Sequence, residues 1–169
     1  MTLEEAIKTA INYETKVRDL YKEAADKATD EAGRKVFSIL GDEEQGHLDY
    51  LASRYKEWKE SGHVKIEALG TVIPDKEKIA QGIRTLGQKV EGADYSEELD
   101  LLKRALQMEK DTGEFYQRMV RELDDEGQRL FERFVEIEEG HYAIVQAQID
   151  ALTGMGFWFD SMEFNLENA

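Results

Sequence analysis

The sequence has 169 residues, enough for one domain with a substantial hydrophobic core. Its 22 basic and 37 acidic side chains give a net charge of −15, which disfavours binding to nucleic acid or to an anionic membrane. There is no cysteine, which excludes disulfides, thiolate nucleophiles, iron–sulfur clusters and cysteine-ligated zinc within these residues. No apolar run approaches the roughly 20 residues that span a bilayer. The first residues lack a signal-peptide pattern, so we expect a cytoplasmic protein.

Hydrophobic periodicity predicts two long helices in the first third of the chain. Apolar residues three and four positions apart predict a helix over residues 2–28, followed by a polar break at 30–33. A second helix is predicted from Phe37 through Trp58, up to a stop at Gly62. Because the break is short, the two helices should form an antiparallel hairpin.

Residues 62–95 have a different composition. They contain the only proline, Pro74, and a β-branched stretch at 71–73. A short helix capped near Asp75 is predicted to follow. Its apolar face would consist of Ile79, Ile83, Leu86 and Val90. The segment is long enough to run back along a whole helical bundle.

The second half repeats the hairpin pattern. A third helix is predicted after Ser96, a polar break at 124–127, and a fourth helix that ends near Gly154. Two hairpins joined by a long crossover predict an all-α, ferritin-like four-helix bundle over residues 1–154. Residues 155–169 form an aromatic tail, predicted to pack against this bundle or a partner's. Its aromatic residues are Phe157, Trp158, Phe159 and Phe164.

The two halves are copies of one hairpin, because they align at an offset of 94 or 95 residues. Each copy carries a glutamate on its first helix and a Glu-x-x-His motif on its second. These six residues are Glu14, Glu44, His47, Glu109, Glu138 and His141.

All six side chains fall in the middle of the apolar faces of their helices, so they are predicted to point into the core. An isolated buried carboxylate costs several kcal/mol or takes up a proton, and no lysine or arginine lies at the middle of these faces. Two divalent cations would balance four carboxylates, and this set of oxygen and nitrogen ligands suits iron or manganese. A hydrogen-bonded core without metal is the plainer alternative.

These motifs resemble those of rubrerythrin and its ferritin-like di-iron relatives, over about residues 2–153. The matching segments are Tyr13-Glu14, Glu43-Glu44-Gln45-Gly46-His47, Met108-Glu109 and Glu138-Glu139-Gly140-His141. The resemblance implies two bound iron ions, with manganese or zinc as substitutes, and reduction of hydrogen peroxide or dioxygen.

The resemblance also assigns roles to the six residues. It makes Glu14 and Glu109 terminal ligands. It makes Glu44 and Glu138 bridging ligands. His47 and His141 would each complete one metal position.

Two departures from rubrerythrin bear on turnover. Without cysteine the chain lacks a rubredoxin-like iron centre, so an external electron-transfer protein is expected. Thr112 stands where rubrerythrin has a second glutamate, one turn after Glu109. Thr112 and Gly113 are interpreted as opening space for a small oxidant. Thr112, Tyr21 and Tyr116 are candidates for contact with the ligands.

Other functions are compatible with the same residues. A ferroxidase or iron-storage protein would need a closed cage, whereas the crossover and tail favour a homodimer or small homo-oligomer. A non-catalytic metal-binding bundle and an oxygenase of an organic substrate are further alternatives, because a fold and a metal site do not fix the reaction.

Overall fold

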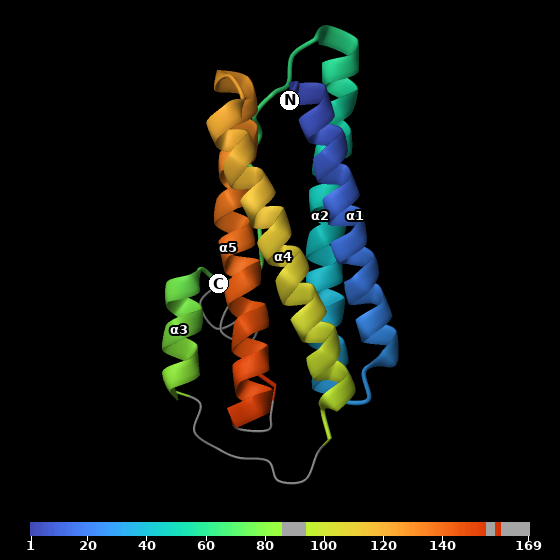
Figure 1. Cartoon of the computed structure of the whole chain (residues 1–169), viewed down its shortest axis with the longest axis vertical. Coiled ribbons are helices and arrows are strands. Elements are labelled where there is room, and N and C mark those ends of the chain that lie inside the picture. The colour runs from blue at the N-terminus through green and yellow to red at the C-terminus, as the bar shows by residue number, and fades with distance from the viewer. Residues whose placement is uncertain (86–93, 155–157, 160–169) are drawn as a thin grey trace.

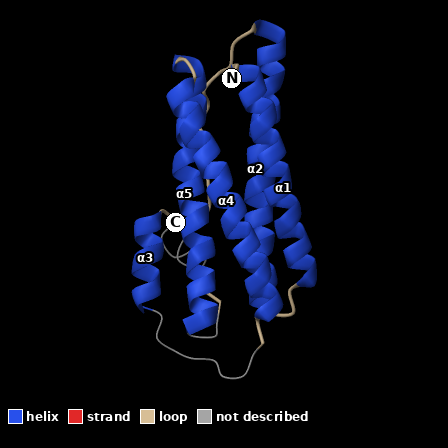
Figure 2. Cartoon of the chain, viewed as in Figure 1, coloured by secondary structure: helices blue, strands red, loops and turns tan. Residues whose placement is uncertain are grey.

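The computed structural model describes residues 1–85, 94–154 and 158–159, which form five α-helices (Figures 1 and 2). The helices are α1 (Leu3–Lys27), α2 (Glu31–Ser61), α3 (Lys76–Thr85), α4 (Ser96–Glu122) and α5 (Asp125–Gly154). The four long helices form two antiparallel hairpins, α1 with α2 and α4 with α5, and α1 also packs against α4. The predicted all-α, ferritin-like bundle of two hairpins is confirmed.

The connection between the hairpins runs along the bundle, as expected (Figure 1). It leaves α2 at one end of the bundle, passes through α3, which packs on α5, and joins α4 at the other end. Ile73 and Ile79 are buried, and the Asp75 carboxylate accepts a hydrogen bond from the backbone of α3. Of the residues expected on the apolar face of α3, Leu86 and Val90 lie outside the described residues, as does the side chain of Ile83.

The two polar breaks are shorter than the sequence pattern indicates. Residues 30–33 and 124–127 were expected to interrupt the chain, but α2 already begins at Glu31 and α5 at Asp125. The reason is helix capping: Asp30 accepts hydrogen bonds from two backbone N–H groups of the first turn of α2, at 2.8 and 3.3 Å. The polar residues that follow therefore belong to the first helical turn.

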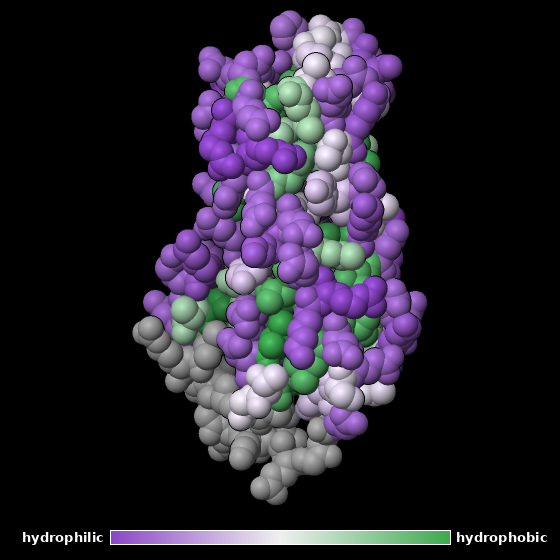
Figure 3. Space-filling view, in the orientation of Figure 1, coloured by the Kyte–Doolittle hydropathy of each residue, from purple (hydrophilic) through white to green (hydrophobic). Residues whose placement is uncertain are grey.

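Two apolar clusters fill the bundle, one on each side of its middle. One cluster is built around Phe37 and Leu102, and the other around Phe131 and Phe134. Hydrophilic residues cover most of the face seen in Figure 3, and hydrophobic ones show between the helices. Among the described helices, none has an apolar stretch of the length that a membrane crossing requires.

Two tail residues pack against the chain's own bundle. Trp158 and Phe159 are buried, and the ring of Trp158 meets that of Phe37 edge-on at 5.5 Å. The side-chain amide of Gln148 exchanges two hydrogen bonds with the backbone of Phe159. Phe157 and Phe164 of the predicted tail lie outside the described residues.

The contact between Trp158 and Gly33 gives a stability prediction. A Cβ atom on Gly33 would lie 2.4 Å from Cζ2 of Trp158, whereas a Cβ on Gly46 has no neighbour within 4 Å. We expect Gly33→Ala to lower the free energy of unfolding by about 1–3 kcal/mol through overpacking. Gly46→Ala, the control, should raise it by about 0.5–1 kcal/mol. Urea unfolding followed by circular dichroism measures the free energy of unfolding of each variant. An equal change in the two variants would contradict the packing of Trp158 on α2.

Candidate metal centre

The six predicted residues meet in the middle of the bundle. Each long helix contributes at its centre: α1 and α4 one glutamate each, α2 and α5 one Glu-x-x-His motif each. All six are between 0% and 2% exposed: Glu14, Glu44, His47, Glu109, Glu138 and His141. They lie between the two apolar clusters, so bulk water is kept from them.

One imidazole faces three carboxylates. Nδ1 of His47 lies 3.2 Å from Oε2 of Glu14 and 3.2 Å from Oε2 of Glu44. Oε1 of Glu138 lies 3.8 Å from the same nitrogen. These four residues offer ligand atoms within 4.8 Å of one another, close enough to surround one cation.

The second imidazole faces the other half of the cluster. Nδ1 of His141 lies 2.7 Å from Oε1 of Glu44 and 3.8 Å from Oε1 of Glu109. Glu44, Glu109 and His141 form a second compact group of ligand atoms. Glu44 belongs to both groups, and the two imidazole rings are stacked at 5.2 Å. The geometry therefore provides two adjacent cation positions that share one carboxylate.

Several buried atoms of the cluster have no hydrogen-bond partner among the described residues. Ion pairs offset the cost of burial for some of them, but a buried polar atom without a hydrogen bond is still costly. The atoms are Oε1 of Glu44, Oε2 of Glu109, both carboxylate oxygens of Glu138, Nε2 of His47 and both ring nitrogens of His141. Carboxylate oxygens and an imidazole nitrogen that converge without partners are the donors that a divalent metal needs, so the residues fit a metal centre.

The pKa values of the metal-free cluster follow from burial and from the closeness of its four carboxylates. Burial, with the negative charge of Glu44, raises the pKa of Glu14 to about 8. Burial and the neighbouring carboxylates also raise the pKa values of Glu109 and Glu138. Without metal, protons therefore reduce the negative charge of these carboxyl groups.

The remaining three groups form a charged core. Burial opposes the charged form of His47, but Glu44 and Glu14 outweigh it and raise the pKa of His47 to about 10. Burial likewise opposes the imidazolium of His141, yet Glu44 raises its pKa well above the usual value. Burial also opposes ionisation of Glu44, but the two imidazoliums hold its pKa well below the usual range. Metal binding must displace these protons.

The two tyrosines predicted to contact the ligands both do so, and each reaches a candidate ligand on the other helix of the α1–α4 pair. Tyr21 on α1 donates a hydrogen bond to Glu109 on α4, and Tyr116 on α4 donates one to Glu14 on α1. Both tyrosines are fully buried. Each hydroxyl orients one carboxylate, so the two halves of the cluster are tied together.

Thr112 does not contact the cluster through its hydroxyl, which donates to the Met108 carbonyl of its own helix at 2.9 Å. Gly113 lines a cavity beside the cluster. This cavity of about 370 Å³ lies between α4 and α5, lined by Gly113 and by the carboxylate-bearing residues Glu109 and Glu138. Exposed Tyr142 also lines it, so the cavity lies at the surface beside these two glutamates.

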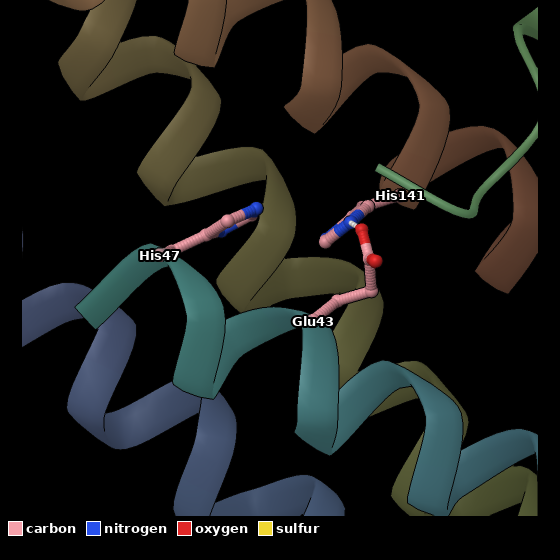
Figure 4. A group of neighbouring side chains, drawn as sticks. All are labelled: Glu43, His47 and His141. Carbon is pink, nitrogen blue, oxygen red and sulfur yellow. Dashed lines mark ion pairs between the residues drawn. The ribbon is translucent and has the colours of Figure 1, made fainter. Parts of the chain in front are cut away.

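Glu43 is a neighbour of the cluster that the sequence reasoning missed. Its Oε2 lies 3.5 Å from Nε2 of His141, and Figure 4 shows the carboxylate of Glu43 beside the imidazole ring. Glu43, His47 and His141 also offer ligand atoms within 4.8 Å of one another. The signal available in the sequence was a break in the repeat, because the position equivalent to Glu43 in the second half is Ile137.

A bundle of two helical hairpins with a long crossover and a central carboxylate–histidine cluster defines the ferritin-like class of proteins. A family model of rubrerythrin matches residues 5–149, so the chain belongs to the rubrerythrin family. Comparison with curated proteins found no match, and comparison with solved structures found none either. The buried cluster and the family together fit a di-iron site.

Proposed function

We propose that the cluster binds two iron ions and that the protein reduces hydrogen peroxide or dioxygen with electrons from an external donor. The observation that carries the proposal is the convergence of four carboxylates and two imidazoles, several of whose atoms lack partners, at the buried centre of a rubrerythrin-family bundle. A structural core has no need of such atoms, since each is costly to bury.

The ligand set divides between two positions. Glu14 and His47 would serve one ion, and Glu109 and His141 the other. Glu44, which is close to both imidazoles, would serve both ions. Glu138 lies near His47, and its role as the second shared ligand rests on the resemblance to rubrerythrin. Two divalent ions would balance the four carboxylate charges.

The protein's contribution to the reaction is a dry, oriented and accessible site. Two ferrous ions would supply the two electrons that, with two protons, convert hydrogen peroxide to two water molecules. The apolar clusters limit access of water, and the cavity beside Gly113 would be the side from which a small oxidant approaches. These 169 residues contain no cysteine for a thiolate-ligated iron centre, so electrons would come from a separate electron-transfer protein.

Stopped-flow oxidation of the diferrous protein tests the proposal. We expect rapid oxidation by hydrogen peroxide or dioxygen, with loss of that phase in Glu44→Ala. Equally slow reaction with both oxidants would reject the oxidoreductase and favour a structural metal site. Oxidation followed by growth of an iron mineral in a closed assembly would favour iron storage instead.

The tyrosine hydrogen bonds give a further prediction. Tyr116→Phe keeps the ring that packs 4.8 Å from Phe134 but removes the donor to buried Glu14. We expect a cost of about 1–3 kcal/mol in the free energy of unfolding and about tenfold weaker metal binding. Chemical unfolding and anaerobic metal titration measure the two effects. Tyr13→Phe is the control because Tyr13 stacks on Phe115 without contacting the cluster; equal effects of the two variants would contradict the role of the Tyr116 hydroxyl.

A further inference from the structure

The two halves of the metal centre differ at one carboxylate, Glu43, which is held by the crossover. The hydroxyl of Thr71 donates to Oε2 of Glu43, and the backbone N–H of Val72 donates to Oε1 at 3.0 Å. Both oxygens of Glu43 are therefore fixed by residues that belong to neither helical hairpin. The side chain of Glu43 is only 11% exposed.

Glu43 in turn lies against His141. Nδ1 of His141 faces Glu44 at 2.7 Å, and Nε2 faces Glu43 at 3.5 Å, so the ring lies between two carboxylates. Figure 4 shows the carboxylate of Glu43 beside this ring, with the crossover passing close to His141. A carboxylate on the far nitrogen of a metal-binding imidazole fixes the ring orientation and raises its basicity as a ligand.

The other half has no such arrangement. The residue equivalent to Glu43 is Ile137, which is buried and carries no charge. Nε2 of both imidazoles lacks a hydrogen-bond partner among the described residues, but only Nε2 of His141 has a carboxylate, that of Glu43, recorded within ion-pairing distance there. Among the described residues, the crossover also comes close to the glycine before His141 but not to the glycine before His47. A Cβ on Gly140, next to His141, would lie 3.3 Å from the carbonyl oxygen of Pro74, whereas its counterpart Gly46 has open space.

We propose that Glu43, held by the Thr71–Val72 segment of the crossover, is a positioning residue that orients His141 and makes the His141 metal position the tighter of the two. This inference rests on the proposed function, since it presupposes two metal ions in the cluster. It assigns the crossover a role in the site beyond connecting the hairpins.

Metal titration in single-histidine backgrounds tests the proposal. His47→Ala leaves the His141 position, and His141→Ala leaves the His47 position. With Co²⁺ under argon as the probe, followed by visible absorption, we expect tighter binding in His47→Ala than in His141→Ala. Adding Glu43→Gln should weaken binding about 10- to 100-fold in the His47→Ala background and leave the His141→Ala background unchanged.

Two controls separate positioning from general damage to the crossover. Glu139→Gln removes a different contact of the crossover, the 3.0 Å ion pair with Lys76, and should leave Co²⁺ affinity unchanged. Thr71→Val removes one of the two donors to Glu43 and should have a smaller effect than Glu43→Gln in the same direction. Circular dichroism confirms that each variant folds.

A measurement without metal tests the orientation of His141 on its own. The sequence has three histidines, His47, His63 and His141, so their ring ¹⁵N resonances can be assigned by substitution. Glu43→Gln should shift the Nε2 resonance of His141 and leave the other two rings unchanged. A His141 resonance that does not move would overturn the proposal.

The outcomes also separate this proposal from the proposed function. Two Co²⁺ ions in the unmodified protein, with equal effects of Glu43→Gln in both backgrounds, would overturn the positioning role and leave the dinuclear site standing. If the unmodified protein binds a third Co²⁺ ion that Glu43→Gln no longer binds, Glu43 is a metal ligand, and its positioning role is overturned. Failure of the unmodified protein to bind Co²⁺ or Fe²⁺ would reject the dinuclear site. It would then also reject the proposed difference in metal affinity between the two positions.

Discussion

Protein purified without oxygen is expected to contain about two iron ions per chain, and the Glu44→Ala/Glu138→Ala variant is expected to contain none. Glu44 lies within 3.2 Å of one imidazole and 2.7 Å of the other, and Glu138 lies 3.8 Å from His47. Removing both glutamates leaves two carboxylates for two dications, too little negative charge to hold them in a buried site. Elemental analysis gives the metal content directly.

The control for this experiment addresses the acidic surface. A net charge of −15 attracts cations without any specific site. Asp42→Ala/Glu136→Ala removes two exposed carboxylates from the same two helices and should keep the full metal content. Equal loss in both double variants would show surface binding, and no iron after reconstitution with ferrous iron would leave a protein with a metal-free acidic core.

Metal should also stabilise the fold. A ligand that binds only the native state stabilises it by about 2.7 kcal/mol at a free concentration 100 times its dissociation constant. The apolar clusters on either side of the centre should persist without metal, so we expect the metal-free protein to remain helical but to unfold at lower denaturant concentration.

The second large effect concerns pH. We expect the free energy of unfolding of the metal-free protein to fall as the pH rises from 4.5 towards 10. The pKa of Glu14 is about 8 in the folded protein against 4.5 when unperturbed, and that of His47 is about 10 against 6.5. Between these values the unfolded chain binds fewer protons than the native state, so stability decreases with increasing pH. Burial of the carboxylates, which favours their protonated form, is the cause for Glu14.

With metal bound, the pH dependence should reverse. Metal replaces the protons of the cluster, so its affinity, and the stability it adds, increase as the pH rises. Chemical unfolding at pH 5.5, 7 and 8.5, with a chelator or with Zn²⁺, measures both curves. Glu14→Gln is the matched variant, because it removes one titrating group and should flatten the metal-free curve. A metal-free protein whose stability is constant or rises over this range would contradict the assignment of protons to the cluster.

The repeat explains why so much of the centre could be predicted from local pattern. The inward position of a residue on a helix depends on its neighbours three and four positions away, and the Glu-x-x-His motifs fall in the middle of such faces. Two short connections and one long one then leave few bundle topologies. The fold class and the meeting of the six residues, including Glu14 and His141, follow from these local rules.

The contacts that distinguish the two halves could not be predicted in this way. Glu43 and Ile137 occupy equivalent places in the repeat, and only the path of the crossover brings Thr71 to the first of them and Pro74 to Gly140. Such contacts join residues far apart in the chain, whose proximity depends on the packing of the whole bundle.

The sequence by itself thus determined the helices, their pairing and the inward-facing carboxylates and imidazoles. The reason is that the spacing of apolar residues within one helix already decides which face of that helix is buried. The tertiary structure decided that Tyr21 and Tyr116 reach the carboxylates of the opposite hairpin, that Trp158 packs over Gly33, and that Glu43 lies behind His141. These features depend on helix-to-helix distance and on the course of the crossover, which are set by long-range packing rather than by the order of residues within any one helix.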